Sequence, residues 1–193
     1  NMKVVYPKYV PMMVLPNIFL LPNQLLPLHI FEDKYKAMIE DVIDGDRIFG
    51  ICDKTVYKME NKNEVASVGL LHACEKQDKG TSDLMLLGLQ KVKILNLNNE
   101  KIYPRFEIDP IDTQSLEPRQ QDVVIEHILE KVEPIVNSNR EITDVINKIS
   151  ESKNIDLLLD YSILLTQKDP KIQKKMFQTI DIKEKMRLFE SIM

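Results

Sequence analysis

Residues 20–51, LLPNQLLPLHIFEDKYKAMIEDVIDGDRIFGI, constrain the fold of this chain more than any other stretch. Pro22 and Pro27 interrupt its first apolar run, and proline disrupts the interior of a helix. We therefore predict that residues 25–31 form an extended, largely buried strand. Apolar residues then recur at a spacing of three and four, which predicts a helix with one buried face. These residues are Tyr35, Met38, Ile39, Val42 and Ile43.

The ends of this helix are also marked in the sequence. Asp33 occupies an N-cap position, and Gly45 stands where the chain must leave the helix. Residues 47–51 then predict a second short strand, which completes a strand–helix–strand unit. Because Glu32 and Arg47 flank the helix, we predict a partly buried ion pair between them with a structural role.

The remainder of the first 115 residues alternates between short apolar runs and polar turns. We expect a proline-bounded first strand within residues 3–16, and further strands at residues 55–59, 65–75, 84–95 and 103–109. Gly69 interrupts the run at 65–75, which indicates a bulge. The spacing predicts an antiparallel meander or a small barrel.

The period changes to that of a helix after residue 115. Residues 124–135 predict a helix with a bend at Pro134, and residues 142–149 predict a second one. Residues 155–166 are apolar nearly all round, so we expect this helix at the centre of a bundle. Asp169-Pro170 and the Asp181/Glu184 pair mark two further helix starts. The predicted fold class is α+β, with a β-rich part at 1–115 and a helical part at 116–193.

Composition excludes several classes of function. The formal net charge is −4, and neither part is basic: residues 1–115 hold 14 Lys/Arg against 16 Asp/Glu, and residues 116–193 hold 12 against 14. No strong nucleic-acid signal follows. No run is long and apolar enough for a membrane helix, and no signal peptide is visible, so we expect a cytoplasmic protein.

Motifs that carry chemistry are absent from the sequence. There is no GxxxxGK[ST], GxGxxG or GxSxG, and His29, His72 and His127 lack ligand spacing. A zinc site from Cys52, Cys74 and His72, or a Cys74 nucleophile beside His72, is conceivable but lacks the remaining groups such a site needs. We therefore predict no catalytic residue, no cofactor and no metal, and two reduced cysteines.

The stretch LLPLHIFEDKYKAMIEDVIDGDRIFGI closely resembles the amino-terminal domain of Lon-type ATP-dependent proteases, especially its free-standing bacterial relatives. Lys34 and Lys91 depart from the family pattern, which often has arginine there. The matching segments are residues 14–16, 20–22, 26–32, 35 and 45–50. The motif residues expected to hold the fold are Pro27, Phe31, Glu32, Tyr35, Arg47 and Gly50.

The resemblance implies a PUA-like pseudo-barrel with one packed helix, followed by a helical bundle. It also implies a non-catalytic module that recognises unfolded or specific protein and peptide partners, without the ATPase and protease domains. Two alternatives stay open, an RNA-binding PUA-like module and a small-molecule-binding domain. The oligomeric state is not indicated.

Apolar side chains in residues 10–15 and 18–26 outnumber the positions on one face of a strand. Some of them must cover other elements or face a partner. Methionine suits surfaces that accept varied apolar groups. We therefore predict that part of this set contributes to a partner site, with the two methionines foremost. The set is Met12, Met13, Leu21, Leu25 and Leu26.

Overall fold

The computed structural model describes residues 3–58 and 63–193, and the chain divides into two compact units, Asn1–Ile111 and Asp112–Met193. We call them the β unit and the helical unit. The division expected from the sequence was after residue 115. Each unit is described by itself.

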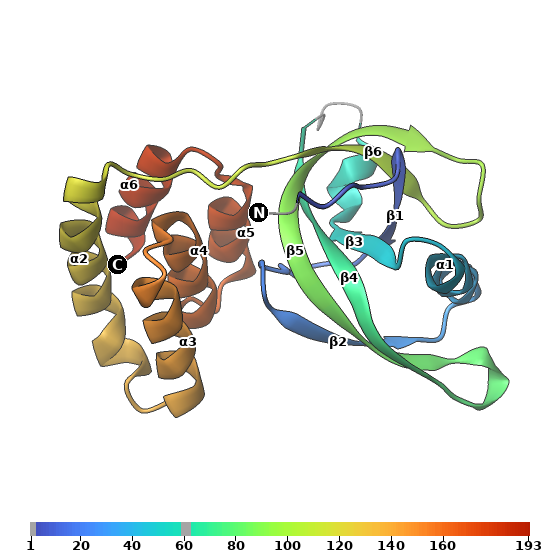
Figure 1. The fold of residues 1–193 in the computed structure, drawn as a ribbon, viewed down its shortest axis with the longest axis horizontal. Coiled ribbons are helices and arrows are strands. Elements are labelled where there is room, and N and C mark those ends of the chain that lie inside the picture. Colours follow the sequence, from blue (N-terminus) through green and yellow to red (C-terminus); the bar gives the residue numbers. More distant parts are fainter. Residues whose placement is uncertain (1–2, 59–62) are drawn as a thin grey trace. The chain divides into compact units, whose positions relative to one another are not determined.

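Where the structure describes it, the β unit contains six strands and one α-helix (Figure 1). The strands are β1 (Tyr9–Val14), β2 (Leu25–Ile30), β3 (Ile48–Cys52), β4 (Val65–Lys76), β5 (Ser82–Asn98) and β6 (Arg105–Pro110), and helix α1 spans Asp33–Asp44. Among the described residues, the 3₁₀ turns η1 (Lys54–Tyr57) and η3 (Asp78–Gly80) lie between strands. The predicted strand at residues 55–59 is therefore wrong where the structure describes it, and residue 59 lies outside the described residues.

The strand order β2-β5-β4-β3-β1-β6, with an additional β5–β6 pairing, closes five strands into a ring. β1 and β3 are parallel, and all other pairs are antiparallel. The long strand β5 makes closure possible, because residues 82–87 pair with β2 and residues 92–98 pair with β6 along the same strand. The predicted pseudo-barrel of mostly antiparallel strands is confirmed.

Gly88 lies in β5 between the residues that pair with β2 and those that pair with β6. Because it has no side chain, the segment before β2 can approach β5 closely at this point. The N–H of Asn23 donates to the Gly88 carbonyl at 2.8 Å, and the Gly88 N–H donates to the Gln24 carbonyl at 2.8 Å. A Cβ on Gly88 would lie 2.0 Å from the carbonyl oxygen of Leu21, which is a backbone atom. Only glycine therefore allows the segment before β2 to lie against β5 here.

Two apolar clusters stabilise the β unit. One draws side chains from all five ring strands, including Met12 and Phe106, and fills the ring. The other contains Met13 of β1 together with the buried face of α1, and joins that helix to the sheet (Figure 1). Since successive residues of a strand point to opposite faces, both faces of β1 are buried.

Helix α1 follows the sequence prediction except at its start. Its N-cap is Glu32 rather than Asp33, and Gly45 is its C-cap, as predicted. The predicted pair between Glu32 and Arg47 is wrong: Glu32 lies 3.9 Å from Lys34, and Arg47 donates to the Leu71 carbonyl. The helix between the two residues has 12 residues and is about 18 Å long, at a rise of 1.5 Å per residue.

The helical unit contains helices α2 (Pro118–Val136), α3 (Arg140–Glu151), α4 (Ile155–Thr166), α5 (Pro170–Gln178) and α6 (Ile182–Ile192). α4 contacts the other four, and its residue 155 and residues 157–163 are buried, which confirms its predicted central place. Four helices begin at a side chain that accepts a backbone N–H: Asn139, Asn154, Asp169 and Asp181. The caps predicted at Asp169 and Asp181 are confirmed.

A charged cluster lies in the centre of this bundle. The Lys185 ammonium of α6 is buried and donates to Asp156 and, at 2.9 Å, to Asp160, both on α4. Burial by itself lowers the pKa of Lys185, but the charges and hydrogen bonds of Asp160 and Asp156 outweigh it and raise that pKa. Lys185 is therefore a cation in the folded protein at neutral pH.

Candidate partner-binding surface

The two methionines predicted to face a partner lie in the core. Met12 is 0% and Met13 4% exposed, because the ring covers one face of β1 and α1 covers the other. The Met12 sulfur occupies the space above Gly50, where a Cβ would lie 2.3 Å from it. Their assignment to a partner surface is therefore corrected. They are packing residues.

The three leucines of the predicted set have different environments. Leu21 is buried, and Leu26 is half-buried against the cluster that includes α1. Leu25 is 48% exposed at the start of β2. The expectation that β2 is largely buried is also wrong, because its exposure alternates along the strand and only Ile30 is fully buried. One face of β2 therefore points to solvent.

Strand register continues this exposed face across β5 and β4. In an antiparallel pair, residues directly opposite each other project from the same face. The pairings therefore align three rows across the three strands. The rows are Leu25–Leu87–Leu70, Pro27–Met85–Ala73 and His29–Asp83–Glu75.

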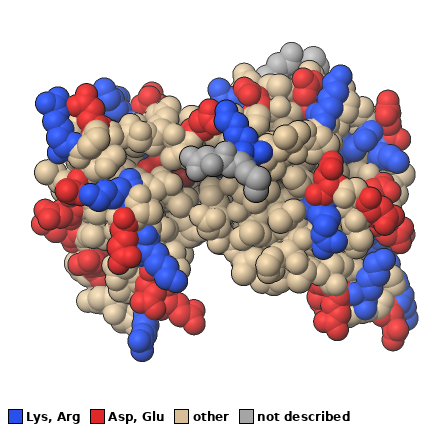
Figure 2. Space-filling model, viewed as in Figure 1, with Lys and Arg blue, Asp and Glu red and all other residues tan. Residues whose placement is uncertain are grey.

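Two of these rows are apolar, and they form the surface that we call the β2–β5–β4 face. Leu25, Pro27 and Ala73 are exposed, and Leu70, Met85 and Leu87 are half-buried. Figure 2 shows an area without charged side chains over these strands, with lysines, arginines and acidic residues around it. Contiguous apolar side chains that reach the surface make this face a candidate partner site.

The third row gives the face a polar end. His29 Nδ1 lies 2.7 Å from Asp83 Oδ1, and the Gln77 amide also donates to Asp83. The Phe31 ring is 62% exposed and stacks on His29 with 6.0 Å between the ring centroids. A groove of about 560 Å³ runs between the polar end and the apolar rows. It is lined by Pro27, Leu28, His29, Ala73, Cys74, Glu75, Asp83, Leu84 and Met85.

Three other motif residues, Tyr35, Arg47 and Gly50, stabilise the β unit that carries this surface. The Val14 N–H donates to the Tyr35 hydroxyl at 2.9 Å, which connects α1 to β1. Arg47, at φ 60°, turns the chain from α1 into β3, and its guanidinium donates to the Leu71 carbonyl of β4 at 3.3 and 3.4 Å. Gly50 leaves room for Met12 inside the ring. These residues stabilise the fold and do not form a reactive site.

The described residues offer no metal-binding cluster of three or more His, Cys, Asp or Glu side chains. Cys52 and Cys74 are free cysteines. Burial, followed by the charges of Glu64 and Asp53, raises the pKa of the Cys52 thiol to about 12, so Cys52 is a poor nucleophile. A register shift between Leu71 and Ala73 leaves His72 without an opposite residue in the β4–β5 register.

Sequence reasoning missed three members of the β2–β5–β4 face: Leu70, Met85 and Leu87. The signal for a strand was present in LMLLGL, but this run is apolar at every position except glycine. Periodicity cannot distinguish the two faces of such a strand. The pairing of β5 with β2 decides which of its residues are exposed.

Comparisons with known proteins agree with this architecture. The profile of the ATP-dependent protease La (LON) substrate-binding domain matches residues 9–193. The N-terminal domain of the Mycobacterium avium complex Lon protease superposes with a TM-score of 0.74 at 13% identity, over 95% of this chain and 97% of that one. A Lon N-terminal domain protein from Xanthomonas campestris superposes with a TM-score of 0.64 at 13% identity, over 96% of this chain and 98% of that one. At these identities the likeness establishes the fold.

Curated relatives include Lon proteases of Buchnera aphidicola. The protein of subsp. Acyrthosiphon pisum is 26% identical over 157 residues, which are 78% of this chain and 20% of the relative. The protein of subsp. Baizongia pistaciae is 22% identical over 191 residues, which are 95% of this chain and 24% of the relative. The chain thus spans about a fifth to a quarter of the length of these relatives.

Within the described residues, no helix is both long and apolar enough to cross a membrane. Given the profile match over residues 9–193, the chain belongs to the substrate-binding domain family of the ATP-dependent protease La, Lon.

Proposed function

We propose that this chain is a non-catalytic recognition module that binds apolar segments of protein partners through the β2–β5–β4 face. The observation that carries the proposal is the register, which places two apolar rows side by side across three strands and leaves them accessible. The substrate-binding name of the family supports protein partners.

The chemistry of the face suits an unfolded or extended partner. Folded proteins bury most large apolar side chains, so a surface that offers apolar area with few hydrogen-bonding groups favours segments that expose such side chains. Leucine and methionine adapt to varied shapes, which permits several partners. The polar row at His29 and Asp83 limits the apolar area at one end. The free cysteines are compatible with a reducing compartment, and we propose the cytoplasm.

The test is binding of a permanently unfolded protein, such as reduced and carboxymethylated lactalbumin, to the purified chain. We expect the double variant Leu25→Ser/Met85→Gln to weaken binding about tenfold, which corresponds to about 1.4 kcal/mol of lost apolar contact. Binding is measured by fluorescence anisotropy of the labelled unfolded protein, and circular dichroism checks that the variant is folded.

The matched control removes apolar area elsewhere on the same unit. Ile102 is 71% exposed, and Ile102→Ser should leave binding within about twofold of the original. Equal weakening by the control would indicate unspecific apolar binding. Unchanged binding by the double variant would exclude the β2–β5–β4 face as the site.

A further inference from the structure

A second cavity lies entirely within the helical unit, between α2 and α6. Its volume is about 390 Å³. Helical spacing places its lining on one stripe of each helix, residues 124, 127 and 128 of α2 and residues 183, 186, 187 and 190 of α6. Leu159 of α4 and Phe189 of α6 complete the lining, and both are buried.

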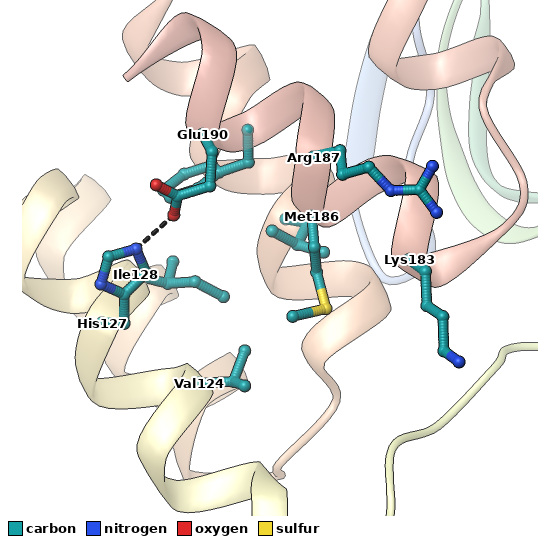
Figure 3. A pocket seen from close by; sticks show the side chains of 9 residues that line it. Val124, His127, Ile128, Lys183, Met186, Arg187 and Glu190 are labelled. Atoms are coloured by element: carbon teal, nitrogen blue, oxygen red, sulfur yellow. Dashed lines mark hydrogen bonds and ion pairs between the residues drawn. The ribbon is translucent and has the colours of Figure 1, made fainter.

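The cavity combines an apolar wall with charged residues. Val124, Ile128, Leu159, Met186 and Phe189 supply the apolar part. Figure 3 shows Met186 between two polar groups, with His127 and Glu190 on one side and Arg187 and Lys183 on the other. The cavity is therefore apolar along its wall and polar at both ends.

The charges at the two ends are not equivalent. Glu190 is the only acidic residue of the lining, and it pairs with His127. Lys183 and Arg187 are exposed, and within the described part of the chain neither has an ion pair or side-chain hydrogen bond. Like charges four residues apart on a helix repel each other, so an anion between them would be stabilised.

We propose that the α2–α6 cavity binds the carboxyl terminus of a peptide whose last residue is large and apolar. The apolar side chain packs against Val124, Ile128 and Phe189. The terminal carboxylate binds Arg187 and Lys183, because a guanidinium offers paired donors that match a carboxylate. This site goes beyond the proposed function, since its ligand is recognised by charge as well as by apolar area.

The size and charge of the cavity favour this occupant. A cavity at the low end of the range for small ligands holds one or two side chains rather than a folded surface. An internal segment of a chain has no carboxylate at its backbone, so it would leave the cations unpaired. A neutral apolar ligand would also leave the two cations unpaired.

The test uses two fluorescent hexapeptides that end in leucine, one with a free carboxylate and one with a terminal amide. We expect the acid to bind about tenfold more tightly than the amide, and Lys183→Gln/Arg187→Gln to abolish this preference. The matched control Lys168→Gln/Arg140→Gln removes the same charge from exposed positions and should retain it. Val124→Asp should weaken binding of both peptides.

Equal binding of acid and amide would overturn the proposal, as would a preference that survives Lys183→Gln/Arg187→Gln. Displacement of the acid peptide by laurate at much lower concentrations than by unlabelled peptide would overturn it too, because the ligand would then be a lipid carboxylate. The double variant changes only exposed residues, so it stays informative if Val124→Asp does not fold. Loss of this site should leave capture of unfolded protein unchanged, which distinguishes its failure from that of the β2–β5–β4 face.

Discussion

The centre of the β unit is apolar, whereas the centre of the helical unit contains a lysine and two aspartates. Met12, Val68 and Phe106 fill the ring by shape, and Gly50 supplies room for the methionine. Lys185 instead reaches two carboxylates of α4 from α6. An apolar core tolerates substitutions that preserve volume, but a buried charge depends on each of its partners. We therefore expect substitutions at the two centres to destabilise the two units in different ways.

The largest effect should come from removing the buried cation. Lys185→Met leaves Asp156 and Asp160 close together without a counter-charge, which should cost about 3–5 kcal/mol. Urea unfolding followed by circular dichroism at the helical signal measures the loss. Lys183→Met, on the exposed side of the same helix, is the control and should change stability by less than about 0.5 kcal/mol.

The pH dependence of this cluster follows from the raised pKa of Lys185. A folded-state pKa above the ordinary value of 10.5 gives stability that is fully present below 10.5 and is lost as pH rises through the folded value. The stability difference between the original chain and Lys185→Met should therefore be constant near neutral pH and shrink in strong alkali. A difference that shrinks already below pH 10.5 would contradict the assigned charge state.

Truncating the centre of the ring should have the next largest effect. Met12→Ala creates a cavity above Gly50 and should cost about 2–5 kcal/mol. Hydrogen exchange should show the loss of protection in strands β1 and β3 and unchanged protection in α4. A loss of stability below about 0.5 kcal/mol would show that the Met12 side chain does not stabilise the ring.

A smaller loss should follow from a methyl group at the crossing of β5. Gly88→Ala places a Cβ against the Leu21 carbonyl, and overpacking of this kind costs about 1–3 kcal/mol. The amides of Asn23 and Gly88 should exchange faster, because their hydrogen bonds join the two segments. Ala73→Ser on the exposed part of β4 serves as the control. Unchanged exchange rates of both amides would show that the segment before β2 shifts to accommodate the methyl group and keeps its hydrogen bonds.

The smallest perturbation is a chemical probe that leaves stability unchanged. Cys52 is buried and its pKa is raised to about 12, whereas Cys74 is half-buried. A maleimide should therefore label one thiol in the folded chain and two in urea, as counted by mass spectrometry. In Lys185→Met we expect the labelling of Cys52 to stay slow, because Cys52 packs in the apolar cluster that fills the ring. Fast labelling of both thiols in the original chain would contradict a closed ring.

Local sequence patterns were sufficient to predict the helices. The spacing of Tyr35 and Met38, the exit at Gly45 and the caps Asp169 and Asp181 all depend on neighbours within a few residues. The apolar run of α4 predicted its central place for the same reason. Helical hydrogen bonds join residues four apart, so the sequence contains both partners within one short window.

The sequence alone could not predict how the strands of the β unit pair. Closure of the ring joins β1 to β6, about a hundred residues apart, and β5 changes its partner near Gly88. These pairings decided that Met12 and Met13 are buried and that exposed Leu25 shares a face with half-buried Met85 and Leu70. Both faces of these strands are apolar, so only the register between distant strands determines which side chains meet a partner.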